Sequence, residues 1–235
     1  MSALSSIFGY LHGDDGWNIL SGLANTLILW VVGAALGAVL GFAIATLRRY
    51  GPKPIDWLLR VYVEVIRGTP FLVQAYLLYF GGPYLCLALG ESSVCLTLDP
   101  FQAGLLGLTV YGSAYYSELF RAGFEAIPRG HVEAAVTVGF TRGQTLRRII
   151  LPEMTMLVLP SMVNMTILLL KETAVLSIIS VKELKFQVDI IGNRDYAFVE
   201  SFTILALVYW ALVEICGALG RAAETRLSRY RFSHS

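Results

Sequence analysis

Long apolar stretches separated by short charged connections dominate the chain. Residues 16–47 carry no charged side chain, and neither do residues 68–90. A helix rises about 1.5 Å per residue, so roughly 20 mostly apolar residues are enough to cross about 30 Å of hydrocarbon. These two stretches therefore predict two membrane-spanning helices.

Three further apolar stretches contain a few ionisable residues. They cover residues 101–123, with Glu118 near the end, residues 154–181, with Lys171 and Glu172, and residues 201–220, with Glu214. No amphipathic segment is long enough to cover such helices as a soluble core. We therefore expect an all-α integral membrane protein with five transmembrane helices and one domain over residues 19–220. The first helix is too long for the apolar region of a signal peptide, and no Lys or Arg precedes it, so we expect it to be retained.

Composition and charge placement support this interpretation and predict an orientation. The chain is 56% hydrophobic and 15% charged, whereas soluble domains average about 25% charged residues. With five spans, 14 Lys and Arg residues fall on one side and 3 on the other, with Lys171 inside the membrane. Cytoplasmic connections carry the excess of Lys and Arg. This distribution predicts an outer N-terminus and a cytoplasmic C-terminus.

Two of the predicted spans contain local features with structural consequences. Pro70 lies within the second span, where it removes a backbone donor and predicts a kink or a break. In the first span, Gly33, Gly37 and Gly41 recur every fourth residue, so one helix face permits close contact with a neighbour.

The longest cytoplasmic connection predicts two short helices. Pro128 suits the first position of a helix, and Gly139 suits the stop after it. Thr141 and Gln144 form a capping box for a second helix, which Pro152 is expected to end. We expect a helix-turn-helix with accessible backbone at Ala134, Ala135 and Gly139; the alternative is a solvated loop.

This connection resembles the EAA loop of the permease subunits of ABC importers. The matching residues at fixed spacing are Glu133, Ala134, Ala135, Gly139, Ile149, Leu151 and Pro152. Other segments are similar to the polar amino acid branch, of the histidine, glutamine and arginine type: Arg67-Gly68-Thr69-Pro70 with Gln74, Tyr116-Ser117-Glu118, Arg121-Ala122-Gly123, Lys171-Glu172-Thr173 and Glu183-Leu184. Val138 stands where Leu is usual, and the resemblance spans about residues 20 to 220.

The resemblance implies a type I ABC importer permease fold with a cytoplasmic coupling helix in the loop 124–152. It further implies ABC ATPase subunits docked on that loop, a second permease subunit of the same or a related chain, and a substrate-binding receptor on the outer side. The location would be the bacterial inner membrane, and the cargo a polar amino acid. The chain has no Gly-x-x-x-x-Gly-Lys-Ser/Thr loop, so we expect it to be non-catalytic, with ATP and Mg bound by the ATPase subunits and no cofactor or metal of its own.

Charges inside the membrane are costly and mark a pathway or a paired structural site. Glu118 precedes Arg121 by three residues, which predicts an ion pair. Glu214 lies near the inner end of its helix, where a contact with another helix is expected. Lys171 and Glu172 are adjacent and therefore about 100° apart unless the helix is broken there.

We expect a polar substrate site built from the second and fourth spans. Its candidate residues are Thr69, Gln74, Asn164, Lys171 and Glu172. The two charges complement the carboxylate and ammonium groups of an amino acid, but an ion pair that ties the fourth helix to a neighbour explains them equally well. Whether Cys86 and Cys95 pair in the outer loop is open.

Two other functions compete with this one. The first alternative is an importer permease for another substrate class. The second is a membrane scaffold subunit, since the chain contains no Ser-His-Asp or HExxH pattern and therefore no catalytic constellation. Co-purification with an ATPase distinguishes a permease from a scaffold.

Overall fold

The structure, a computed structural model, describes residues 10, 13–89 and 97–232. Apart from short turns and connections, these residues are helical, and none of them forms a strand. The elements are α2 (Gly13–Tyr50), α3 (Lys53–Gly68), α4 (Phe71–Leu89), α5 (Pro100–Glu125), α6 (Arg129–Thr137), α7 (Arg142–Thr145), the π-helical turn η1 (Leu146–Ile150), α8 (Leu151–Glu172), the 3₁₀ helix η2 (Thr173–Ile179), α9 (Leu184–Asp195) and α10 (Phe198–Phe232). The proposed Cys86–Cys95 pair lies outside the residues whose side chains are described.

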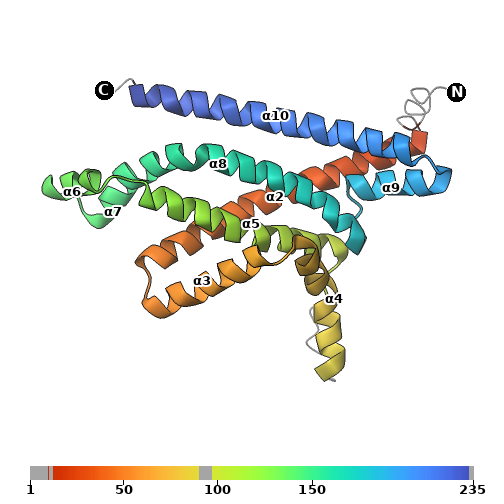
Figure 1. The fold of residues 1–235 in the computed structure, drawn as a ribbon, viewed down its shortest axis with the longest axis horizontal. Helices are drawn as coiled ribbons and strands as arrows, with labels where there is room; N and C mark the ends of the chain where they lie inside the picture. The colour runs from red at the N-terminus through yellow and green to blue at the C-terminus, as the bar shows by residue number, and fades with distance from the viewer. Residues whose placement is uncertain (1–9, 11–12, 90–96, 233–235) are drawn as a thin grey trace.

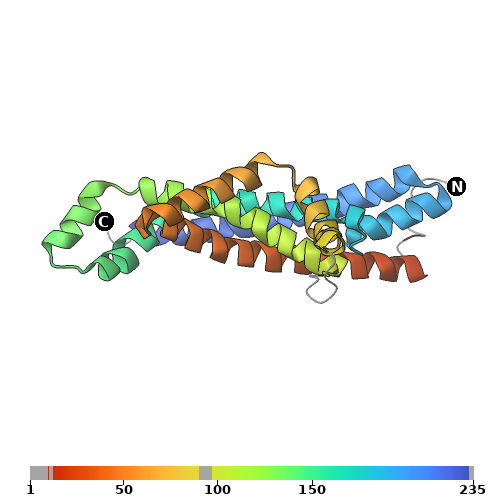
Figure 2. The same ribbon diagram turned by 90° about the horizontal axis from the view of Figure 1, so that it is seen from below.

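The molecule is elongated, and its long helices run along the long axis (Figures 1 and 2). Helices α2, α5, α8 and α10 form the body. The short helices α6 and α7 lie at one end, which we call the hairpin end, and α9 lies at the other, the α9 end. Helix α2 begins at the α9 end, and α10 ends near the hairpin end (Figure 1).

Three described segments are long and apolar enough to cross a membrane: Asp15–Tyr50, Arg142–Ile179 and Phe198–Arg226. They coincide with the first, fourth and fifth predicted spans. Helices α4 and α5 coincide with the second and third, so the expected helices exist. The number of crossings is still a prediction, because α5 carries several polar residues in its second half and α4 is shorter.

Close packing of α2 against α5 forms the centre of the body. A Cβ added at Gly41 would lie 2.7 Å from the Tyr116 Cβ atom and 2.9 Å from the Ser113 carbonyl oxygen. One at Gly37 would lie 3.3 Å from the Gly112 carbonyl carbon. No side chain fits at the first distance without movement of α5, so the glycine spacing in α2 sets the distance between the two helices. This prediction from the sequence is confirmed.

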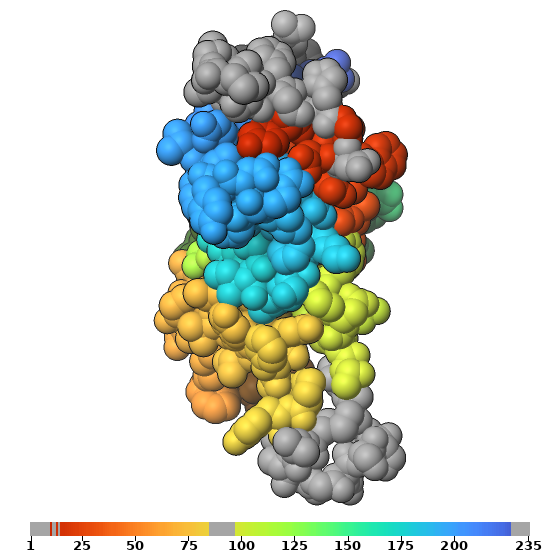
Figure 3. Space-filling view, turned by 90° about the vertical axis from the view of Figure 1, so that its right-hand side faces the viewer, coloured from red at the N-terminus to blue at the C-terminus, as the bar shows by residue number. Residues whose placement is uncertain are grey.

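The chain breaks rather than kinks at Thr69 and Pro70. Helix α3 ends at Gly68, and Thr69 is extended, with φ −118° and ψ 143°. Helix α4 then turns away from the long axis of the body (Figure 1). Figure 3 shows its yellow residues low on the molecule, below the blue α9 and the cyan η2. Only its first turns pack closely, with Phe71 and Ala75 buried against the body.

The second helix of the hairpin does not end at Pro152, so that prediction is wrong. Helix α7 continues through η1 into α8, and Pro152 stands in the first turn of α8. In the π-helical turn the Leu151 N–H donates to the Leu146 carbonyl, five residues back. This wider turn shifts the hydrogen-bond pattern just before the proline, whose missing N–H and ring disturb a regular α-helix.

The fourth predicted span changes helix type at its two charged residues. Helix α8 ends at Glu172, and η2 continues from Thr173 to Ile179. Ser180 then adopts a left-handed conformation, with φ +64°. A 3₁₀ helix advances by 120° per residue rather than 100°, so the side chains on the two sides of this junction have a different angular spacing from those of a continuous α-helix.

Candidate functional site

The hairpin end projects a helix-turn-helix away from the body (Figure 2). Helix α6 ends in a turn in which Gly139 has φ +85°, and a Cβ there would meet no atom within 4 Å. Thr141 then caps α7: its side chain accepts the Gln144 N–H, while the Gln144 side chain accepts the Thr141 N–H at 2.8 Å. The glycine stop and the capping box are thus where the sequence predicts them. Pro128 is not the first helical residue, as predicted, but the residue before it, because α6 begins at Arg129.

Most of the predicted coupling residues lie on the free surface of this hairpin. Glu133, Ala134, Gly139 and Pro152 are exposed, and Ile149 and Leu151 are half-buried. Ala135 is an exception to the expected accessibility, because it is buried and its carbonyl accepts the Phe140 N–H at 3.0 Å. Val136 and Val138 are 62% and 72% exposed. The hairpin therefore presents an apolar surface with one acidic residue.

Two side-chain contacts attach the hairpin to the body. His131 on α6 lies 2.9 Å from the carboxylate of Glu153 on α8. The Arg148 guanidinium lies 5.7 Å from the centre of the Phe140 ring. Both contacts join the hairpin to the segment formed by η1 and the start of α8.

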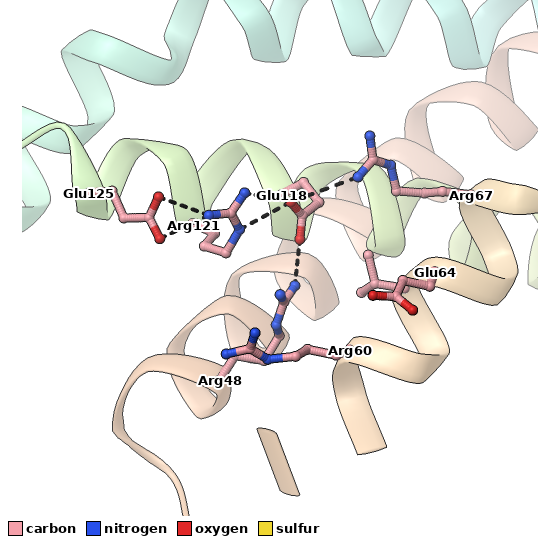
Figure 4. A pocket seen from close by; sticks show the side chains of 8 residues that line it. Arg48, Arg60, Glu64, Arg67, Glu118, Arg121 and Glu125 are labelled. Atoms are coloured by element: carbon pink, nitrogen blue, oxygen red, sulfur yellow. Dashed lines mark hydrogen bonds and ion pairs between the residues drawn. The ribbon is translucent and has the colours of Figure 1, made fainter. Parts of the chain in front are cut away.

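A charge cluster joins α2, α3 and α5 next to the hairpin (Figure 4). Glu118 on α5 pairs with Arg48 of α2 and, at 2.8 Å, with Arg121; the Arg67 guanidinium of α3 is 3.7 Å away. Arg121 also reaches Glu125 at 2.8 Å. The predicted Glu118–Arg121 pair is confirmed. The sequence did not reveal Arg48 and Arg67 as partners, because they are distant along the chain.

Gln74 bridges the break between α3 and α4. Its side-chain N–H₂ group donates to the Ile66 carbonyl at 2.7 Å and to the Thr69 carbonyl and hydroxyl at 3.1 and 2.9 Å. Its side-chain oxygen is buried and has no hydrogen-bond partner among the described residues. The break therefore holds one buried acceptor that is free to bind a donor.

Glu172 lies close to an aromatic residue of α5 that contacts the start of α4. It is half-buried and within electrostatic range of Tyr111 on α5. The Tyr111 ring lies 5.1 Å from the ring of Phe71, the first residue of α4, and 4.7 Å from the Tyr115 ring. Glu172 is therefore near the aromatic contact between α5 and the start of α4.

Lys171 and Asn164 face another side of α8. Lys171 lines an open apolar groove with Phe202, Tyr209 and Trp210 of α10, and Asn164 lines a neighbouring groove with Glu214. Both are exposed, and Lys171 has no ion-pair partner among the described residues. The structure thus places Lys171 and Asn164 in grooves beside α10, and among the described residues no ion pair joins Lys171 to Glu172.

A buried acid that the sequence analysis did not single out as buried lies at the α9 end. Glu183 is fully buried, caps α9 by accepting the N–H groups of Lys185 and Phe186 at 2.9 and 2.8 Å, and accepts the Thr26 hydroxyl at 3.4 Å. Burial raises the pKa of Glu183 to about 7, although the two N–H groups oppose this. The Lys185 ammonium group instead binds Asp189.

No group of three or more metal-ligating side chains gathers in the part of the chain that the structure describes. The chemistry of these sites is that of ion pairs, hydrogen bonds and exposed docking surfaces.

Comparisons with known proteins agree with this architecture. Residues 33–229 match the family described as binding-protein-dependent transport system inner membrane component. The arginine transport system permease protein ArtQ of Bacillus subtilis is 35% identical over 89% of this chain and 92% of its own length. The probable glutamine ABC transporter permease protein GlnM of the same organism is 35% identical over 82% and 85%. The chain belongs to this family of inner membrane transport components.

A solved structure supports the fold over almost the whole chain. An amino acid ABC transporter crystallised with histidines matches with a TM-score of 0.82 and 33% identity, covering 96% of this chain and 99% of the other. The chain is thus a permease subunit of the ABC transporter class.

Proposed function

We propose that the chain is the transmembrane subunit of an ATP-driven importer that moves polar amino acids across the bacterial inner membrane. The observation that carries this proposal is the match of nearly the whole chain to a solved amino acid transporter. Relatives that carry arginine, glutamine and cystine permease names point to the same class of cargo. Import of another substrate class and a scaffold role are the alternatives.

The orientation is part of the proposal. The N-terminus lies outside and the C-terminus in the cytoplasm, with five crossings between them. The distribution of Lys and Arg supports this. The start of α2 and the end of α10 also lie at opposite ends of the molecule (Figure 1). A tag before Met1 should be accessible only from outside and one after Ser235 only from the cytoplasm. A cytoplasmic N-terminus would contradict the five-span topology.

The hairpin end is the proposed docking surface for the ABC ATPase subunits. Residues 133–152 include the exposed side chains of Glu133 and Val138, and they lead through η1 directly into α8. ATP and Mg bind to the ATPase subunits, and their motion is transmitted to α8 by this connection. At the other end, the outer receptor delivers the substrate.

A second permease subunit completes the pathway in this proposal. Helix α4 leaves the body with exposed apolar residues along its described length, including Leu77 at 66% and Phe80 at 51%. An apolar arm of this kind is suited to contact another permease subunit within the bilayer.

The substrate pathway is proposed to run along α8. Lys171 and Glu172 point in different directions from α8, so one bound amino acid does not contact both of them. We place the ammonium group of the amino acid between the Glu172 carboxylate and the side-chain oxygen of Gln74. Thr69 belongs to this first position, and Asn164 and Lys171 line a second polar stretch facing α10. Irregular backbone that lines a cavity commonly binds polar cargo in transporters.

Replacement of Glu172 tests this position. Glu172→Gln should leave assembly and basal ATPase activity intact while import falls or the preference between cationic and neutral amino acids changes. Glu64→Gln, which removes an exposed acid from α3 outside both proposed positions, is the control. Loss of assembly in step with import would assign Glu172 a structural role, and unchanged import with every substrate would remove it from the pathway.

A further inference from the structure

The arginines near the hairpin end fall into two groups that differ in their partners. Four of them, Arg48, Arg60, Arg67 and Arg121, form ion pairs with acidic residues of α3 and α5. Among the described residues, Arg49, Arg142, Arg147 and Arg148 have no acidic partner. Arg148 instead lies over the Phe140 ring, and Arg49 lies 5.3 Å from the centre of the Phe124 ring. The second group therefore forms no ion pair among the described residues.

Two of the unneutralised arginines line one open cavity between the end of α2 and the hairpin. Arg49 and Tyr50 border it from α2, and Arg142 borders it from α7. Most of its other lining residues are apolar, including Val132 and Val136 from α6 and Leu146 and Ile150 from η1, with Thr141 and Thr145 beside them. No acidic side chain lines this cavity. It therefore combines an apolar interior with two cationic groups at its edge.

The cavity lies at the level where the first predicted span ends. Arg49 and Tyr50 are the last residues of α2, and Trp57 on α3, a few residues further on, is 67% exposed. Tyr and Trp gather at membrane–water interfaces, and Lys and Arg mark the cytoplasmic side. An acidic headgroup at this level would meet both arginines, and its acyl chains would meet apolar side chains.

We propose that an anionic phospholipid of the inner leaflet binds in this cavity and connects α2 to the hairpin. The charge of the lining, the apolar walls and the interfacial level all fit this ligand, since basic pockets between helices on the cytoplasmic side bind acidic lipid headgroups. The inference rests on the orientation and docking surface proposed above. Its consequence is that the position of the hairpin relative to α2 depends on lipid charge.

The test measures retained lipid on the full-length chain purified with its ATPase partner. Complexes are reconstituted with equal amounts of phosphatidylglycerol and phosphatidylcholine of the same acyl chains, extracted, and analysed by native mass spectrometry. Each arginine near the surface contributes about fivefold to the binding of an acidic lipid. The wild type should retain phosphatidylglycerol preferentially, and the Arg49→Gln, Arg142→Gln double variant should lose about 20-fold or more of that preference.

Matched variants separate the possible explanations. Arg226→Gln removes an exposed charge from the same end, outside the cavity, and should keep the preference, as should a double replacement of Arg49 and Arg142 by lysine. Equal retention by the double glutamine variant and the wild type would overturn the proposal, as would release of the lipid by millimolar inorganic phosphate. Loss of the preference with the ATPase still bound would support it. A wild-type chain that keeps the preference but binds no ATPase would contradict the proposed function and leave the lipid site standing.

Discussion

Glu118 connects three helices, and its replacement tests whether the charge cluster holds them together. In Glu118→Gln the shape is kept and the charge is lost. Arg48, whose side chain is only 9% exposed, then retains Asp56 alone, at 3.8 Å from its Nε atom. Breaking a buried pair by removing one partner costs about 3 to 5 kcal/mol. Glu118 itself is 18% exposed, so we expect the lower end, about 3 kcal/mol.

The neighbouring pair in the same cluster provides the comparison. The Arg67 side chain is 44% exposed, and its guanidinium is 3.7 Å from Glu118. Exposed pairs of this kind contribute less than about 1 kcal/mol. Arg67→Gln should therefore destabilise the protein much less than Glu118→Gln, although both substitutions remove one charge from the same cluster.

Thermal unfolding of the purified complex measures the difference. For a chain of this length, about 1 kcal/mol corresponds to a shift of about 2 to 4 °C. Glu118→Gln should lower the Tm by about 6 to 12 °C, and Arg67→Gln by no more than about 4 °C. Equal shifts for the two variants, or no shift for Glu118→Gln, would refute the assignment of the cluster as the tie between α2, α3 and α5.

Three further substitutions test other parts of the structure. Gly41→Ala places a methyl group 2.7 Å from the Tyr116 Cβ atom and should lower the stability measured by thermal unfolding by about 1 to 3 kcal/mol. The control Gly81→Ala, whose methyl group meets open space, should be neutral or stabilising. Equal effects of the two substitutions would contradict the α2–α5 packing. Gly139→Asp strains a left-handed turn on the docking surface and should uncouple ATP hydrolysis from import, so normal import with the ATPase bound would rule out this docking surface. Glu183 has a raised pKa of about 7, so its contribution to stability is complete below its ordinary pKa and disappears as pH rises through 7. The Tm should therefore fall from pH 5 to pH 8, Glu183→Gln should flatten this dependence, and a parallel slope in the variant would contradict the raised pKa.

Features set by local chemistry could be predicted from the sequence. The break at Pro70, the stop at Gly139 and the capping box at Thr141 each depend on a few neighbouring residues, and all are present. The glycine face of α2 was also predictable, because its spacing matches the helical repeat.

Features that depend on tertiary contacts were not predictable in the same way. Pro152 was expected to end a helix, but the π-helical turn before it lets the helix continue. Arg48 and Arg67 reach Glu118 from other helices, and no local pattern reveals such pairs. Lys171 and Glu172 both belong to α8, so their different directions follow from the predicted helical spacing. The change to a 3₁₀ helix directly after them was not predictable, because the apolar pattern continues through η2.

The central claim is that this chain couples ATP hydrolysis to the import of polar amino acids, and reconstituted transport tests it most directly. Proteoliposomes containing the chain with its ATPase partner are loaded with ATP and supplied with the outer receptor and labelled amino acids. The account predicts ATP-dependent uptake of at least one polar amino acid together with receptor-stimulated ATP hydrolysis. Assembly with the ATPase but no uptake and no stimulation, with any amino acid tested, would contradict it.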